Sequence, residues 1–188
     1  MTDFIEDYLQ SLKSEISRLD KGSIQQAAGL LFSAYLSNRQ VFIIGNGGSA
    51  STASHFACDL SKGTIVEGKC RIRVTCLNDN TAILTAISND FGYEHVFSEQ
   101  LKNLAGNGDV LVAISASGNS ANIINGIRLA QDKGVKVIGF TGFDGGMLKQ
   151  LSDLCVHVGS YNYGQVEDIH LFLCHVISQN LRQKILEA

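Results

Sequence analysis

The segment 40–63 places the strongest constraint on the fold of this chain. It begins with a continuous apolar run at 41–44, continues through the glycine-rich sequence GNGGS, and takes on the composition of a helix from Ser49 or Ala50. A buried strand that ends in a glycine turn at a helix N-terminus leaves backbone N–H groups unpaired at the positive end of the helix dipole. This arrangement predicts a binding site for an anion such as a phosphate.

The same device occurs a second time, where the run DVLVAIS at 109–115 leads into the turn SGNSAN. Three other short apolar runs alternate with helical patterns, at 71–77, 135–142 and 153–160. Continuous rather than alternating apolarity is typical of parallel strands covered on both faces. We therefore predict an α/β fold, a five-stranded parallel sheet in a doubly wound, flavodoxin-like sandwich at 38–188, preceded by an N-terminal helical hairpin at 1–37. Ligands of such sheets bind at the carboxyl ends of the strands, where both turns would meet.

Two helical segments predict that the chain associates with copies of itself. Residues 1–19 carry a narrow apolar seam with alternating spacings of four and three, formed by Ile5, Leu9, Leu12, Ile16 and Leu19. A second helix is expected at about 24–36, with Ser23 as its N-cap. The last helix, at about 164–186, is apolar on two sides in its first half, because Leu171 and Phe172 point away from its main stripe. Both features need partners, so we expect a homo-oligomer in which 1–37 takes part.

Charge and composition exclude several classes of function. The net charge is −3 and the basic residues are scattered, which disfavours a nucleic-acid partner. No apolar run reaches the roughly 18 residues of a membrane span, and the acidic N-terminus lacks the pattern of a signal peptide, so we expect a cytoplasmic protein with no membrane partner. The five cysteines are an odd number without CxxC spacing, which predicts buried thiols rather than a disulfide framework or a zinc knuckle. The length of 188 residues suits a single domain at 1–188.

Each glycine turn has an alternative interpretation. GNGGSA at 45–50 also matches the dinucleotide fingerprint G-x-G-x-x-G/A, which needs an acidic residue at the end of the next strand. The run RIRVTCL ends without one, and Glu67 precedes it, so the sequence disfavours NAD(P). A purely structural tight turn leaves the second turn unexplained. In that second turn, serine hydroxyls suit a phosphate or sugar hydroxyls because they donate hydrogen bonds without carrying a charge, although Ser120 is also a plausible helix N-cap.

His55 and Asp59 lie one turn apart on the helix that follows the first turn. An acid–imidazole pair at this spacing is commonly a solvated surface pair worth a few tenths of a kcal/mol. Its position directly after the anion site also suits an acid/base or metal pair. The last helix carries a second polar set, formed by Glu167, Asp168, His170 and His175. Because His175 stands among apolar residues, the default interpretation from the sequence alone is a core histidine whose hydrogen bonds are satisfied.

Five motifs occur in one order along the chain: GNGGSA…HFA, SNDFG, ISASGNSAN, FTGFDGG and EDIH…H. With this set the chain resembles the sugar isomerase (SIS) domain family over its whole length, the N-terminal helices included. GNGGS, NDFG and SGNSAN at these separations are together highly specific, whereas any one alone would be weak. The resemblance implies a single SIS domain, a homotetramer, and a ketose–aldose isomerase that converts a small-molecule sugar phosphate, sedoheptulose 7-phosphate, into D-glycero-D-manno-heptose 7-phosphate.

The resemblance also implies the residues of the site. The substrate-contacting positions would be Asn46, Gly47, Gly48, Ser49, Asn89, Asp90, Ser115, Ala116, Ser117 and Ser120. A divalent metal, expected to be zinc, would be held by His55, Asp59, Glu167 and His175, and Asp59 and His175 would also form the catalytic acid/base pair. The family usually has Glu in place of Asp59 and Gln in place of Glu167. Asp59 therefore reaches less far by one methylene, while Glu167 makes a metal site more anionic and favours its occupancy by a divalent ion.

The implied chemistry is proton transfer through an enediol, with Asp59 as base, His175 as acid, and the phosphate held by the turn at 115–120. Glu167 and His175 are eight residues apart, about 12 Å along a helix, so they reach one ion only by stretching or with a neighbouring subunit. Two alternatives stay open: a non-catalytic SIS assembly factor of the DnaA-binding type, and a sugar-phosphate-sensing regulatory module. Retention of Asp59 and His175 favours the enzyme over the first. The second usually accompanies a DNA-binding domain, for which we expect no room in this chain.

Overall fold

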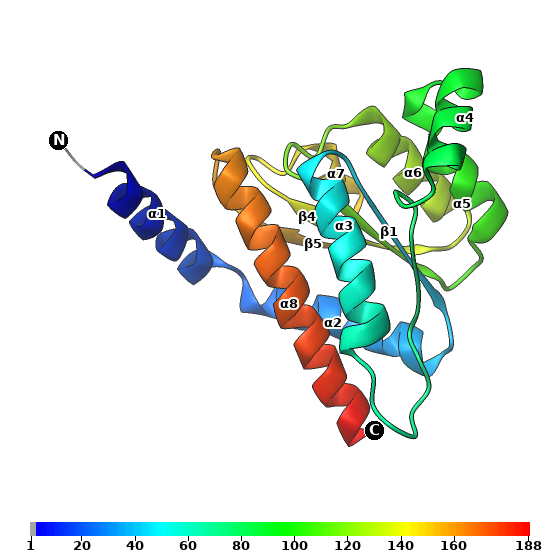
Figure 1. Ribbon diagram of the computed structural model, residues 1–188, viewed down its shortest axis with the longest axis horizontal. Coiled ribbons are helices and arrows are strands. Elements are labelled where there is room, and N and C mark those ends of the chain that lie inside the picture. Colours follow the sequence, from blue (N-terminus) through cyan, green and yellow to red (C-terminus); the bar gives the residue numbers. More distant parts are fainter. Residues whose placement is uncertain (1–2) are drawn as a thin grey trace.

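The computed structural model describes residues 3–188, which form an α/β structure around a five-stranded parallel sheet (Figure 1). The strand order is β2-β1-β3-β4-β5, with the bounds Gln40–Gly45 (β1), Arg73–Cys76 (β2), Val110–Ser115 (β3), Lys136–Thr141 (β4) and Leu154–His157 (β5). This order is flavodoxin-like, so the predicted fold class is confirmed. Because β1 and β3 are hydrogen-bonded neighbours at the centre of the sheet, the turns that follow them leave the same edge side by side.

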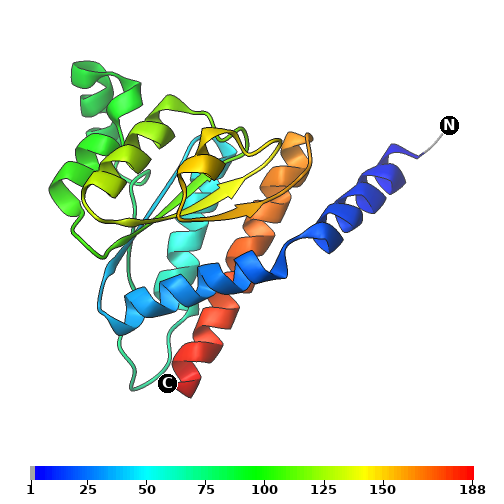
Figure 2. The same cartoon turned by 180° about the vertical axis from the view of Figure 1, so that it is seen from behind.

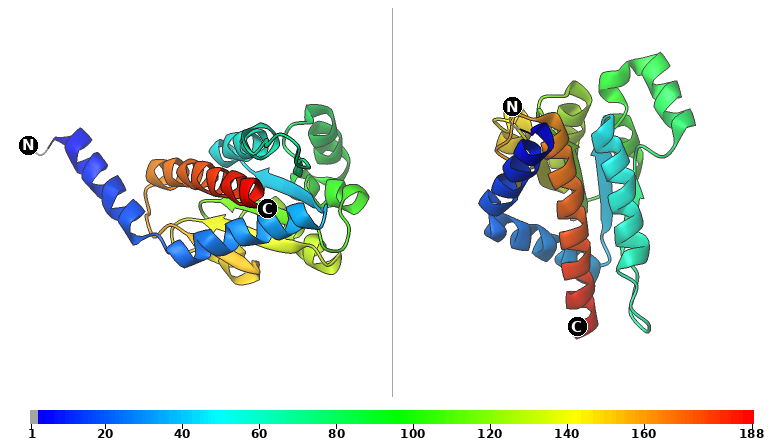
Figure 3. Two further views of the ribbon diagram at one scale, coloured as in Figure 1. Left: turned by 90° about the horizontal axis from the view of Figure 1, so that it is seen from below. Right: turned by 60° about the vertical axis from the view of Figure 1, so that its left-hand side comes forward.

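Helices cover both faces of the sheet (Figures 2 and 3). The residues Ile43, Val112 and Ile138 pack into one core cluster with α2 (Lys21–Leu36), α3 (Gly48–Cys58) and α8 (Tyr163–Glu187). The alternate residues of these strands, such as Phe42 and Leu111, point to the other face. They belong to a second cluster with α5 (Ser98–Leu104), α6 (Ala121–Asp132) and α7 (Gly146–Leu151). Successive side chains of a strand point to opposite faces, so a strand between two helical layers must be apolar at every position.

The two predicted N-terminal helices are present as α1 (Phe4–Arg18) and α2, with two differences from the expectation. The N-cap of α2 is Asp20, whose side chain accepts a hydrogen bond from the Gly22 N–H, rather than Ser23. In addition, α1 extends away from α2 instead of folding back along it as a hairpin (Figures 1 and 2). The predicted apolar seam is divided: Ile5 and Leu9 are exposed, whereas Leu12 and Ile16 are partly buried against the core and Leu19 is buried in it. Residues 1–2 of the predicted segment lie outside the described part of the chain.

Three short elements complete the chain and shift some predicted boundaries. The helix α4 runs over Thr81–Phe91 and therefore includes the Asn and Asp of the NDFG motif. A 3₁₀ turn, η2 (Tyr93–His95), follows it. The helix α3 begins at Gly48, one residue before the earliest predicted start, and its backbone continues beyond Cys58 as a π-helical turn, η1 (Asp59–Gly63).

The long helix α8 packs against both α2 and α3, while Phe172, on the second apolar side noted in the sequence, stays 40% exposed. Its buried residues include Ile169, Leu173 and Ile177 and also a histidine, His170. All five cysteines are free thiols, of which Cys58 and Cys70 are exposed, so the prediction of buried thiols holds only for part of the set. Among the helices of residues 3–188, none combines the length and the apolarity that crossing a membrane requires.

His170 is fully buried, and neither of its ring nitrogens forms a hydrogen bond with residues 3–188. Burial, together with a smaller effect of the neighbouring His157, lowers the pKa of His170 from 6.5 to about 4. The Thr141 backbone opposes this shift without meeting the geometry of a hydrogen bond. The imidazole is therefore neutral in the folded protein at neutral pH and packs beside the ring of Phe140, with 6.0 Å between the ring centroids.

This buried histidine predicts that the fold is less stable in acid. Between pH 6.5 and about 4 the unfolded chain binds a proton at residue 170 that the folded protein does not bind. The free energy of unfolding therefore falls as the pH falls through this window, by up to about 3 kcal/mol from this residue. His170→Leu, an apolar replacement of similar size, is expected to remove that part of the decline. Urea unfolding of both proteins across the window measures it, and parallel pH profiles would contradict the assignment.

Candidate functional site

The turn between β1 and α3 presents a helix N-terminus that no side chain caps. Gly47 occupies the N-cap position, and α3 begins at Gly48 without a side-chain capping bond. Ser49 lies in the first turn of the helix and is almost fully buried. The first backbone N–H groups of α3 and the positive end of its dipole are thus left for a ligand, as the sequence predicted for an anion site.

The turn between β3 and α6 is a second N-terminus of the same kind. The Gly118 N–H donates to both the carbonyl oxygen and Oγ of Ser115, each at 3.2 Å. Ser120 occupies the N-cap position of α6, but its side chain makes no capping bond, so its hydroxyl is available to a ligand. The side chain of Asn119 instead accepts a hydrogen bond from the Met147 N–H at 3.0 Å, which ties this turn to the start of α7.

The two turns enclose one cavity of about 130 Å³, here called the turn cavity. Its walls are formed by the first turn, the second turn, the end of β3 and the start of α8, through Asn46, Ser49, Ile114, Ser115, Ala116, Ser117, Ser120, Tyr163 and Glu167. The predicted meeting of the two turns is therefore confirmed. Six of the predicted substrate-contacting residues line this single cavity, which suits an anion bound by hydroxyls and helix N-termini.

Glu167 points into the turn cavity from α8. Its carboxylate lies so close over Gly48 that a Cβ at this glycine would overlap Oε1 of Glu167, so the absence of a side chain permits the approach. Tyr163, one helical turn earlier, lines the same cavity. The sequence did not indicate Tyr163. The only available signal was its spacing of four residues from Glu167, which places both side chains on one face of a helix.

Asn46 is held by a hydrogen-bonded network inside the site. Its Oδ1 accepts hydrogen bonds from Asn122 Nδ2 at 2.8 Å and from Tyr93 Oη at 2.9 Å, while its Nδ2 donates to Asn122 Oδ1 at 2.8 Å. These three bonds fix the orientation of the amide beside the first turn. The sequence alone indicated neither partner. Asn122 lies inside the SGNSAN motif but had no assigned role. Tyr93 directly follows NDFG, and only the fold brings it close to Asn46.

Asn89 and Asp90 lie apart from the turn cavity. They belong to the last turn of α4, are exposed, and bond to each other, Asn89 Nδ2 donating to Asp90 Oδ1 at 2.8 Å. Gly47 is exposed at the N-cap of α3 and does not line the cavity either. The structure therefore does not bring these three residues together with the second turn, 115–120, here called the serine turn. Their contact with substrate stays a prediction.

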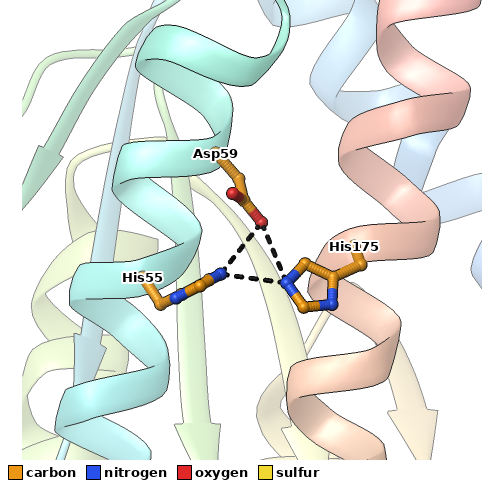
Figure 4. A group of neighbouring side chains, drawn as sticks. All are labelled: His55, Asp59 and His175. Carbon is orange, nitrogen blue, oxygen red and sulfur yellow. Dashed lines mark hydrogen bonds and ion pairs between the residues drawn. The ribbon is translucent and has the colours of Figure 1, made fainter.

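A second group of polar side chains joins α3 to α8, where His55, Asp59 and His175 converge (Figure 4). Asp59 Oδ2 lies 3.5 Å from His55 Nε2 and 3.7 Å from His175 Nε2, and the two Nε2 atoms are 2.9 Å apart. We call these three residues the His/Asp cluster. Asp59 opens the π-helical turn η1, and such turns are frequent at functional sites. His175 is thus part of this cluster rather than a core histidine with satisfied hydrogen bonds.

The His/Asp cluster fits the divalent metal that the sequence predicted. Asp59 Oδ2 is buried and lacks a hydrogen-bond partner anywhere in 3–188, although it faces two imidazole nitrogens. The three possible ligand atoms all lie within 4.8 Å of one another. A buried carboxylate oxygen without a partner is costly unless a cation is bound, and two histidines with one carboxylate form a donor set that zinc accepts. Glu167 is not in this group, and its role as a fourth ligand stays a prediction.

A larger cavity, about 730 Å³, lies elsewhere, between α3, β2 and the start of α4. Its walls include Ser54, Cys76 and Asp79, but none of the predicted site residues. It lies beside the edge strand β2, and the helix N-terminus that borders it, that of α4, is already capped by the side chain of Asn80, which accepts a hydrogen bond from the Ile83 N–H. The turn cavity is therefore the candidate ligand site, because two uncapped helix N-termini, serine hydroxyls and the Glu167 carboxylate come together there.

The chain is similar to known proteins in both sequence and structure. Residues 4–142 match the family model described as "SIS domain". The chain is 40% identical over 155 residues to phosphoheptose isomerase of Rhodospirillum rubrum, which covers 82% of each chain, and 34% identical to that of Aneurinibacillus thermoaerophilus, which covers 98% of this chain and 96% of the other. The structure of phosphoheptose isomerase GmhA from Neisseria gonorrhoeae superimposes with a TM-score of 0.87 at 32% identity, covering 94% of this chain and 95% of that one.

Proposed function

Because this chain belongs to the SIS domain family, we propose that it is an isomerase that interconverts sedoheptulose 7-phosphate and D-glycero-D-manno-heptose 7-phosphate. The observation that carries the proposal is the convergence of Asp59 and His175 in a chain that is similar over most of its length to phosphoheptose isomerases. A carboxylate and an imidazole within a few ångströms can exchange protons with neighbouring atoms of one substrate. A silent assembly factor would have no need to keep this pair.

The two turns supply the recognition of phosphate. Serine hydroxyls and uncapped helix N-termini bind a dianion without burying an opposite charge. The Glu167 carboxylate repels a nearby phosphate, so the phosphate belongs at the turn of Ser115–Ser120 and Glu167 faces the sugar hydroxyls, from which it accepts hydrogen bonds. The carbon chain then extends from the turn cavity toward the carbonyl end of the substrate.

Asp59 and His175 perform the proton transfers in this proposal. Asp59 removes a proton from C1, next to the C2 carbonyl, and His175 gives a proton to the carbonyl oxygen, which yields the enediol. Return of a proton to C2, with loss of the proton on O1, completes the aldose. Asp59 Oδ2 faces both histidines, which leaves Oδ1 as the atom that carries the proton.

We also propose that a divalent ion, such as zinc, binds His55, Asp59 and His175. When bound, it polarises the carbonyl and stabilises negative charge on the neighbouring oxygens. Because His175 would use the same Nε2 for the ion and for the proton, the ion, when bound, would take over activation of the carbonyl oxygen, and His175 would act as the acid only in the metal-free protein. Removal of the ion therefore separates the two roles.

The subunit arrangement and the location are further parts of the proposal. The apolar side chains in the first half of α1 are exposed, Phe4 to 77% and Ile5 to 67%, and the two histidines of the His/Asp cluster are about half exposed. Both features suit a homotetramer in which α1 packs on other copies and the site is completed at an interface. Sedimentation equilibrium measures the subunit count, and a monomer would contradict this part. Five free cysteines suit the reducing cytoplasm.

A direct assay tests the reaction. Purified protein is incubated with sedoheptulose 7-phosphate, and the aldose is followed by NMR, with and without EDTA and after addition of zinc. We expect conversion by the metal-replete protein. If EDTA lowers the rate and zinc restores it, the ion takes part, whereas full activity without metal assigns the acid role to His175 alone. Absence of conversion by the metal-replete wild type would contradict the proposed function.

A further inference from the structure

Three aromatic side chains gather beside the turn cavity: Phe143, Tyr161 and Tyr163, here called the aromatic cluster. The rings of Phe143 and Tyr161 are stacked, with centroids 5.7 Å apart and an interplanar angle of 3°. The ring of Tyr163 meets Phe143 edge to face, with centroids 4.7 Å apart and an angle of 87°. Both geometries are preferred ones for aromatic pairs, so Phe143 holds the ring of Tyr163 in a defined orientation.

The backbone at Phe143 supports this arrangement. Phe143 has a left-handed φ of 52°, a conformation that is uncommon for residues other than glycine and that persists only where the surroundings enforce it. Two hydrogen bonds fix the residue: its N–H donates to the Ser160 carbonyl at 3.0 Å, and its own carbonyl lies 3.0 Å from His157 Nε2. These bonds join the loop after β4 to the end of β5 and to the loop that follows it, which leads into α8.

The turn cavity is too small for a whole sugar phosphate. Its volume of about 130 Å³ falls below the roughly 300–1,000 Å³ of typical ligand pockets, so it takes the phosphate end, and the rest of the ligand must cross the rim. Tyr163 and Glu167 line the cavity from α8 at a spacing of four residues. Tyr163 is 58% exposed, so much of its surface is open to a ligand that leaves the cavity on that side.

We propose that Tyr163 is a specificity residue whose ring, braced by Phe143, packs against the C–H groups of the sugar chain as that chain leaves the turn cavity. Glu167 faces the hydroxyls of the same chain. The site thereby distinguishes a phosphorylated polyol chain from phosphate alone, because only the former contacts the ring. The identity of the ligand in this inference rests on the proposed function. The position of the Tyr163 ring beside the turn cavity does not depend on that function.

The test compares binding of two probes, sedoheptulose 7-phosphate and inorganic phosphate, by NMR titration of the full-length protein. Tyr163→Ala is expected to weaken binding of the sugar phosphate by about tenfold, an effect of the size that aromatic contacts make. Its affinity for inorganic phosphate is expected to stay at the wild-type value. Tyr163→Phe keeps the ring and is expected to bind both probes within about twofold of wild type. Phe172→Ala removes another exposed aromatic residue of α8, outside the cavity, and is expected to change neither affinity.

Three results would overturn the inference: unchanged sugar-phosphate affinity in Tyr163→Ala, an equal loss of affinity for both probes, or a loss in Tyr163→Phe as large as in Tyr163→Ala. The second would mean that Tyr163 acts through the serine turn, and the third that its hydroxyl matters instead of its ring. Failure of the proposed function has a different signature. In that case the wild type binds the sugar phosphate without converting it, and the affinities of the variants still decide the role of Tyr163.

Discussion

Asp59→Asn is expected to lower kcat/KM for sedoheptulose 7-phosphate by about 10²- to 10⁴-fold, the range that removal of a general base produces. The amide has the size and shape of the carboxylate but cannot take a proton from carbon. It also removes the negative charge that faces His55 and His175 at 3.5 and 3.7 Å, so bound metal is expected to fall with activity. Steady-state kinetics and elemental analysis of the same protein measure the two effects, and an unchanged thermal midpoint shows that the fold is intact.

Two further variants sharpen this result. Asp59→Glu introduces the residue that the family usually has at this position. This variant is expected to keep kcat/KM within about tenfold of wild type, because the base and the negative charge are retained. Asp168→Asn removes a carboxylate of α8 that bonds Tyr8 Oη at 3.0 Å, outside the His/Asp cluster, and is expected to leave kcat/KM unchanged. Wild-type activity in Asp59→Asn would rule out Asp59 as the base, and an equal loss in both Asn variants would point to a general effect of charge.

The sheet could be predicted from the sequence because its physical cause is local. Runs such as VFII and VLVAI are apolar at every position, and this pattern suits only strands with helices on both faces. The two glycine turns then follow from the direction of parallel strands, which brings their carboxyl ends to one edge of the sheet. The turn cavity between Ser49 and Ser115 is therefore a consequence of strand order, and the structure confirms it.

Other features of the site depend on contacts between residues far apart in the sequence, which no local sequence pattern predicts. His55 and Asp59 share a helix face by spacing alone, but the approach of His175 needs the packing of α8 on α3, which the sequence implied only through a family resemblance. Glu167 is a second example. The resemblance implied that it binds the metal; in the structure it lines the turn cavity, two helical turns before His175 and outside the His/Asp cluster, so its contact with an ion stays a prediction. The direction of α1 depends on contacts such as Ser11 with Gln165, which link residues far apart in the chain.

Gly118→Ala is expected to lower the free energy of unfolding by about 3 kcal/mol and to weaken binding of inorganic phosphate at least about tenfold. Gly118 has a φ of 65°, which alanine adopts only under strain, and an added Cβ would overlap the carbonyl oxygen of Gly145. The clash is with backbone and cannot be relieved by rotation of a side chain. The serine turn must therefore move away from the β4–α7 loop, and the hydrogen bond from Leu148 N–H to the Gly118 carbonyl, 2.9 Å, is lost.

A matched glycine separates this local effect from the general cost of removing a glycine. Gly29 lies inside α2, and an added Cβ there meets no atom within 4 Å. Gly29→Ala is therefore expected to raise stability by up to about 1 kcal/mol, because alanine has the higher helix propensity, and to leave phosphate affinity unchanged. Urea unfolding and phosphate titration of both variants make the comparison. If Gly118→Ala were as stable as wild type and bound phosphate equally well, the serine turn could not be the rigid phosphate wall inferred from its contacts, because a displaced turn would then bind as well as the observed one.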